Sequence, residues 1–170
     1  MQQDQAVELR YGAWPPNTDS MSHNARMNEA DLRVQLGKLV DVSLSVAESD
    51  HDLRTQEPSL VDIIRLVREH PGSLTVAEEV LAGLVPRLAE DDPACWLGLP
   101  ELLAYSVYAL GMPRVVAEAE RFRVAALAKA ASGLSGRPWE HARRCERVIE
   151  AASPDWEERD MFDSLEPPSV

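Results

Sequence analysis

The stretch from Asp91 to Arg114, DDPACWLGLPELLAYSVYALGMPR, decides the fold that this sequence predicts. Pro100 suits the first turn of a helix, and Gly111 suits the end of one. Between them, apolar or amphipathic side chains surround the helix almost completely: Leu102, Leu103, Tyr105, Ser106, Tyr108, Ala109 and Leu110. A helix that is apolar all round is normally buried, so we expect this one at the centre of the domain.

The aromatic residues of this stretch, Trp96, Tyr105 and Tyr108, have two interpretations. Amphipathic aromatic side chains suit both protein cores and ligand pockets. Because aromatic residues make up only 5% of the chain, a domain of this size needs several of them to fill its centre. We therefore favour a core role. The alternative is a helical ligand-binding or regulatory domain whose pocket is lined by these three side chains.

Helical patterns also occupy the sequence before this stretch. Asn28 is a good N-cap for a helix that runs to about Glu48, and an acidic loop is expected over residues 48–57. Pro58 and Ser59 are expected to open the next helix, which the sequence His70-Pro71-Gly72 ends. Thr75 and Glu78 form a capping-box pattern for a third helix, which Pro86 kinks or stops.

Two further helices are predicted after Gly111, opened by Pro113 and by Pro138. No convincing strand exists, so the predicted fold class is all-α: a single compact bundle of six or seven helices with short loops. Residues 1–27 form an irregular N-terminal arm and residues 28–152 the helical domain. Residues 153–170 form an acidic C-terminal tail that can hold one more short helix, from Asp155 to about Leu165.

Residues 60–84, LVDIIRLVREHPGSLTVAEEVLAGL, resemble the first two helices of a winged helix-turn-helix domain. The resemblance implies a basic or polar recognition helix in the next position. The sequence instead continues VPRLAEDDPACW, with three consecutive acidic residues, so DNA recognition is not expected there.

The net charge of −12 excludes several classes of partner. A polyanion repels phosphate backbones and anionic lipid surfaces, so neither nucleic acid nor a membrane is expected to bind. Residues 113–152 are the exception, with eight basic against five acidic side chains.

There is no signal-peptide pattern and no apolar run long enough to span a bilayer, which favours a cytoplasmic protein. Arginine outnumbers lysine by 15 to 2, a bias that we interpret as a bacterial or phage origin.

No constellation in the sequence predicts catalysis, a metal or a cofactor. His141 and Cys145 lie four residues apart on one predicted helix face, as two metal ligands do, but arginines crowd the same turns and there is no second pair of ligands. We expect a buried cysteine and an exposed histidine. The stretch GLSG at residues 133–136 lacks the spacing of a nucleophile elbow. The chain is therefore expected not to be an enzyme.

The tail carries the candidate partner-binding residues, in which large apolar groups are set among acidic ones: Trp156, Glu157, Glu158, Asp160, Met161, Phe162 and Leu165. Such a segment either docks into a groove of a partner or folds back on its own domain. The hypothesis for function is a non-catalytic acidic protein that occludes a basic surface of another protein. The hypothesis rests on analogy with bacterial immunity proteins, antitoxins and phage-encoded inhibitors, which are often small and acidic because their targets are frequently basic. Head-to-tail self-association between the basic helix pair and the acidic tail is a further alternative.

Overall fold

The computed structural model describes residues 27–50, 52–70, 72–133 and 136–156, and this part of the chain is helical without a strand. Its elements are α1 (Glu29–Ser49), α2 (Leu53–Glu69), α3 (Ser73–Ala82), a 3-10 helix η1 (Val85–Ala89), α4 (Pro93–Leu97), α5 (Leu99–Leu110), α6 (Pro113–Ala131) and α7 (Pro138–Glu150). The prediction of an all-α bundle with short loops is confirmed.

Helix α5 is the centre of the bundle, as its sequence predicts. Every side chain from Leu99 to Val107 is buried. The helix ends at Gly111, whose φ of +64° is a conformation that residues with a Cβ rarely adopt. The expected roles of Pro100 in the first turn and of Gly111 at the end are confirmed.

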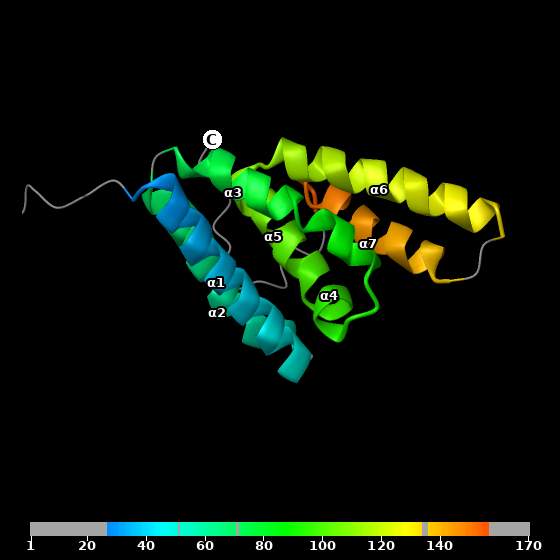
Figure 1. Ribbon diagram of the computed structural model, residues 1–170, viewed down its shortest axis with the longest axis horizontal. Helices are drawn as coiled ribbons and strands as arrows, with labels where there is room; N and C mark the ends of the chain where they lie inside the picture. The colour runs from blue at the N-terminus through cyan, green and yellow to red at the C-terminus, as the bar shows by residue number, and fades with distance from the viewer. Residues whose placement is uncertain (1–26, 51, 71, 134–135, 157–170) are drawn as a thin grey trace, which may run out of the picture.

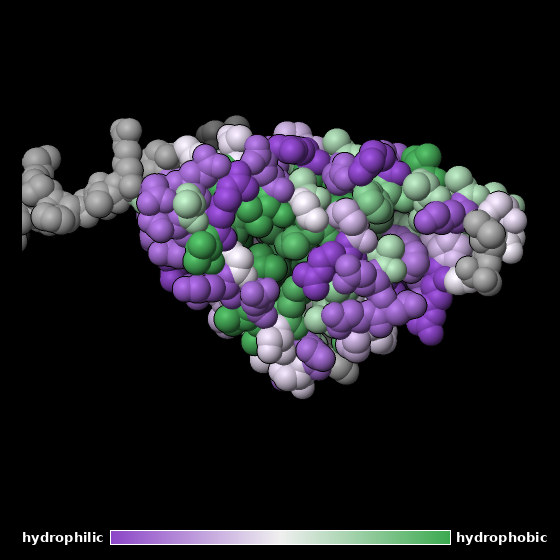
Figure 2. All heavy atoms as spheres, in the orientation of Figure 1, coloured by the Kyte–Doolittle hydropathy of each residue, from purple (hydrophilic) through white to green (hydrophobic). Residues whose placement is uncertain are grey.

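Two pairs of helices flank α5 (Figure 1). Helices α1 and α2 pair on one side, and α6 and α7 form a hairpin on the other. Figure 2 shows polar side chains over both pairs and apolar side chains in the middle of this face. None of the described helices is long and apolar enough to cross a bilayer.

The start of α1 is as expected, but the start of α2 is not. The Asn28 side chain caps α1 by accepting the N–H of Asp31 at 2.8 Å. Helix α2 begins at Leu53, so the acidic loop shortens to residues 50–52 and Pro58 lies inside the helix. The earlier start is due to Asp52, whose side chain accepts the N–H of Arg54 at 3.0 Å.

The third helix also starts earlier than its sequence pattern suggests. Helix α3 begins at Ser73, directly after Gly72 with a φ of +88°, so Thr75 is not its N-cap and the expected capping box is wrong. The Ser73 hydroxyl donates to the Val67 carbonyl at 2.6 Å and fixes this start against α2. The chain continues after α3 into the 3-10 helix, which contains Pro86, and then into the five-residue α4.

The C-terminal end of α1, the first turns of α2 and the end of α4 meet at a close-packed junction. The Gln56 side chain, fully buried, donates to the Ser43 hydroxyl at 2.9 Å and to the Gly98 carbonyl at 3.1 Å. A Cβ on Gly98 would lie 2.4 Å from the Cβ of Ala47. Only glycine fits there, which fixes α4 against α1.

Candidate functional site

An open groove of about 690 Å³ lies between α7 and the start of α5, with α4 at one side. Its lining is mostly charged. It contains four arginines (Arg137, Arg143, Arg144 and Arg147) and four glutamates (Glu101, Glu140, Glu146 and Glu150), together with Trp96 and Pro100. A lining with so many full charges fits a polar or charged partner segment better than an apolar small molecule.

A buried ion pair joins the two walls of the groove. The Arg147 guanidinium contacts Glu101 through Nε at 2.6 Å and through Nη2 at 2.7 Å. The Glu101 side chain is only 9% exposed although it lies on the apolar helix α5. Because an unpartnered charge at that depth is costly, the pair ties α7 to α5. Sequence reasoning missed this pair; a single carboxylate within an apolar helix was the signal for it.

Arg144 holds α7 to the 3-10 helix at the other side. Its Nη1 donates to the Leu88 carbonyl at 2.7 Å, and its side chain is 11% exposed. Glu140 lies between two guanidiniums, 3.6 Å from Arg137 and 3.7 Å from Arg144. Three of the four arginines in the groove are therefore paired. Arg143 is the fourth, and it has no hydrogen bond or ion pair to the described part of the chain.

The three aromatic residues considered for a pocket differ in their surroundings. Trp96 is 43% exposed and lies in the charged groove. Tyr105 is 2% exposed within the core, where burial raises the pKa of its hydroxyl to about 12. Tyr108 is half-buried and contacts Trp156, with 5.5 Å between the ring centroids. The burial of Tyr105 and Tyr108 fits the favoured core role, and a pocket formed by all three side chains stays a prediction.

Of the candidate partner-binding residues, the structure describes Trp156 alone. This side chain is 4% exposed and belongs to the hydrophobic core, so its indole is not available as a partner's anchor. Asp155 and Trp156 are not helical, so the short tail helix does not begin at Asp155. Glu157, Glu158, Asp160, Met161, Phe162 and Leu165 lie outside the described residues.

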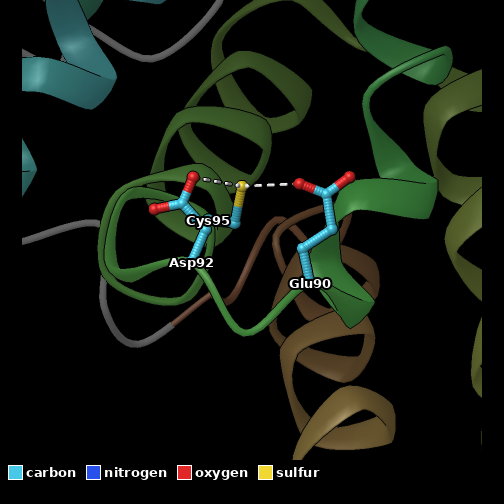
Figure 3. Close-up of side chains that lie close together, drawn as sticks. All are labelled: Glu90, Asp92 and Cys95. Atoms are coloured by element: carbon cyan, nitrogen blue, oxygen red, sulfur yellow. Dashed lines mark hydrogen bonds between the residues drawn. The ribbon is translucent and has the colours of Figure 1, made fainter.

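Cys95 lies beside two carboxylates in the loop before α4 (Figure 3). One potential ligand atom from each of Glu90, Asp92 and Cys95 lies within 4.8 Å of the others. The thiol donates to Glu90 Oε2 at 3.4 Å and accepts from Arg87 Nη2 at 3.3 Å. Burial and the hydrogen bond to Glu90 raise the pKa of the Cys95 thiol to about 11. A protonated sulfur beside a guanidinium disfavours the binding of a cation. We therefore interpret the cluster as a set of contacts that holds the loop before α4 in place.

The pair His141 and Cys145 likewise has a structural explanation. Cys145 is 2% exposed, and burial raises the pKa of its thiol to about 11. His141 is half-buried rather than exposed, so that part of the expectation is wrong. Burial, together with the nearby Arg144 guanidinium, lowers the pKa of the His141 imidazole. The two side chains lie in no metal-ligand cluster within the described ranges.

An acidic surface lies at the end of the molecule where α1, α2 and α4 meet. It consists of six exposed carboxylates from two segments, the last turn of α1 with the loop after it and the loop before α4: Glu48, Asp50, Asp52, Glu90, Asp91 and Asp92. The first segment comes directly after Ala47, and the second precedes α4, whose five residues span about 7.5 Å. The contact between Gly98 and Ala47 therefore brings both segments to one end of the bundle (Figure 1). We call this surface the acidic end.

Comparison with protein-family models, with curated proteins and with solved structures finds no match to this chain.

Proposed function

We propose that this chain is a non-catalytic, cytoplasmic protein that binds another protein and inhibits it by covering a basic surface. The observation that carries the proposal is the separation of charge along the fold. Residues 27–112 hold 15 acidic and six basic side chains, a net charge of −9, whereas residues 113–152 hold five acidic and eight basic ones, a net charge of +3.

The acidic end supplies the contact surface in this proposal. Its six carboxylates are exposed, and three basic side chains lie near them: Arg54 at the start of α2, Arg87 in η1, and Arg144 on α7, whose Nη1 lies 3.4 Å from the Glu90 carbonyl. Arg87 is already engaged with Glu90 and Cys95. Opposite charge speeds the encounter of two proteins and orients them before contact. The partner class that fits is a basic protein, such as an enzyme that acts on nucleic acid.

Both thiols support a binding role over nucleophilic chemistry at the cysteines. Cysteine attacks as its thiolate, and a thiol whose pKa is raised to about 11 is protonated at neutral pH. Cys95 and Cys145 are also buried, so a substrate has no access to either sulfur in the folded protein.

The experiment is capture from the native host with two variants of equal charge. Glu48→Gln/Asp91→Asn removes two exposed carboxylates from the acidic end. Glu69→Gln/Asp155→Asn removes two exposed carboxylates elsewhere. We expect a basic protein that is retained by the wild type and by the second variant and is weakened in the first. Equal retention by both variants would contradict the acidic end as the contact surface.

A further inference from the structure

The groove of α4, α5 and α7 has the side chains of a docking surface on its open side. The Trp96 indole is 43% exposed, and the exposed Arg143 side chain belongs to the same lining. Tryptophan and arginine are the residue types that most often anchor protein interfaces. The occupant must therefore offer both apolar and acidic groups.

The groove lining itself is balanced, with four arginines and four glutamates, and the charge that favours an anionic occupant comes from the surrounding α6–α7 hairpin. Three of the groove's four glutamates contact arginines already: Glu101 contacts Arg147, Glu140 contacts two lining arginines, and Glu146 lies 3.9 Å from Arg123 on α6. The hairpin of α6 and α7 carries a net charge of +3, so an acidic segment near the groove is attracted over a longer range as well.

The chain itself contains such a segment directly after the last described residue. Residues 157–170 hold five acidic side chains and one arginine, a net charge of −4, together with Met161, Phe162 and Leu165. The segment leaves the fold at Trp156, which the contact with Tyr108 holds on α5. Glu101, in the groove, lies seven residues before Tyr108 on the same helix, a distance of about 10 Å along its axis.

We propose that residues 157–170 dock into this groove within the same molecule, with apolar side chains against Trp96 and acidic ones against Arg143. Met161 to Leu165 come five to nine residues after Trp156, which extended chain covers in up to about 17–30 Å. Because both ends of the contact belong to one chain, the local concentration of the tail is in the millimolar range, about that expected for a short tether. A weak contact is then enough to keep the groove covered.

The inference goes beyond the proposed function, because docking of the tail needs no partner. It also assigns the tail a role that the acidic end does not have. A partner that uses the tail or the groove must displace the intramolecular contact first. The two proposals fail separately, since the acidic end is tested with a partner and the tail is tested without one.

The test monitors the indole N–H signals of the tryptophans by NMR in the full chain and in a chain ending at Trp156. We expect the Trp96 signal to differ between the two chains. Trp139, 66% exposed on α7 but outside the groove lining, is the internal reference and is expected to stay unchanged. A synthetic peptide of residues 157–170, added to the shorter chain, is expected to shift the Trp96 signal saturably toward its position in the full chain.

Two full-length variants complete the test without truncation. Arg143→Glu is expected to move the Trp96 signal toward that of the shorter chain and to weaken peptide binding by about fivefold or more. Lys129→Glu makes the same charge change on α6, outside the groove, and is expected to do neither. The proposal is overturned if the Trp96 signal is the same in the full chain, in the shorter chain and in Arg143→Glu. It is also overturned if the signal depends on protein concentration, because the occupant is then the tail of a second copy.

Discussion

Replacing Gly98 by alanine tests the junction that forms the acidic end. The added Cβ lies 2.4 Å from the Ala47 Cβ and 3.1 Å from Gln56 Nε2, whereas carbon atoms in contact are about 3.5–4.0 Å apart. The Ala47 Cβ cannot rotate away because it is fixed to the backbone of α1. The backbones of α1 and α4 must therefore separate, and the hydrogen bond from Gln56 to the Gly98 carbonyl must lengthen.

The expected loss of stability is about 2–3 kcal/mol. Overpacking of a close contact costs roughly 1–3 kcal/mol, and weakening one buried hydrogen bond costs about 0.5–1.5 kcal/mol. The smaller entropy of the unfolded alanine chain offsets about 0.4–1 kcal/mol of this. The backbone of residue 98, with φ −99° and ψ −33°, is open to any residue, so steric overlap alone decides the sign.

Gly37→Ala is the matched control, because Gly37 lies inside α1 and a Cβ there meets no atom within 4 Å. It is expected to stabilise the protein by about 0.5–1 kcal/mol, the ordinary gain of alanine over glycine in a helix. The assay is equilibrium urea unfolding monitored by far-UV circular dichroism. If Gly98→Ala is as stable as the wild type while Gly37→Ala is stabilised, the contact between α1 and α4 is not as described.

Further predictions concern Trp156, the two thiols and His141. Trp156→Ala, which empties the site beside Tyr108, is expected to cost about 3–5 kcal/mol in urea unfolding, whereas Asp155→Ala changes stability little. At mildly alkaline pH, Cys95 and Cys145 are expected to react with a thiol reagent only as fast as the protein opens, and denaturant is expected to expose both at once. The folded pKa of His141 lies below the unfolded value of 6.5, so the unfolded state binds the proton first and the free energy of unfolding falls as pH drops below about 6.5. His141→Gln is expected to flatten this fall, and an unchanged pH profile would contradict the burial of His141.

The helices after Gly83 could be predicted well because proline and glycine mark their ends. Pro100, Gly111, Pro113 and Pro138 each restrict the backbone locally, so no distant residue is needed to place these boundaries. The start of α2 was misplaced because Pro58 also suits a first turn, and the cap formed by Asp52 outweighs that preference.

The groove could not be predicted in the same way. Its defining ion pair joins Glu101 to Arg147, 46 residues later, and spacing within one helix says nothing of a contact between two helices. The burial of Trp156 is a similar case, because the acidic sequence around it resembles a solvated tail. The packing of Trp156 against Tyr108 shows that the hydrophobic core extends beyond α7.

The association rate constant of the captured partner, measured over a series of salt concentrations, tests the central claim most directly. For the wild type we expect a rate that falls steeply with salt. Glu48→Gln/Asp91→Asn is expected to associate about twofold to fivefold more slowly at low salt and to depend less on salt, while Glu69→Gln/Asp155→Asn behaves as the wild type does. A rate that is indifferent to salt, or equal in all three proteins, would contradict binding through the acidic end.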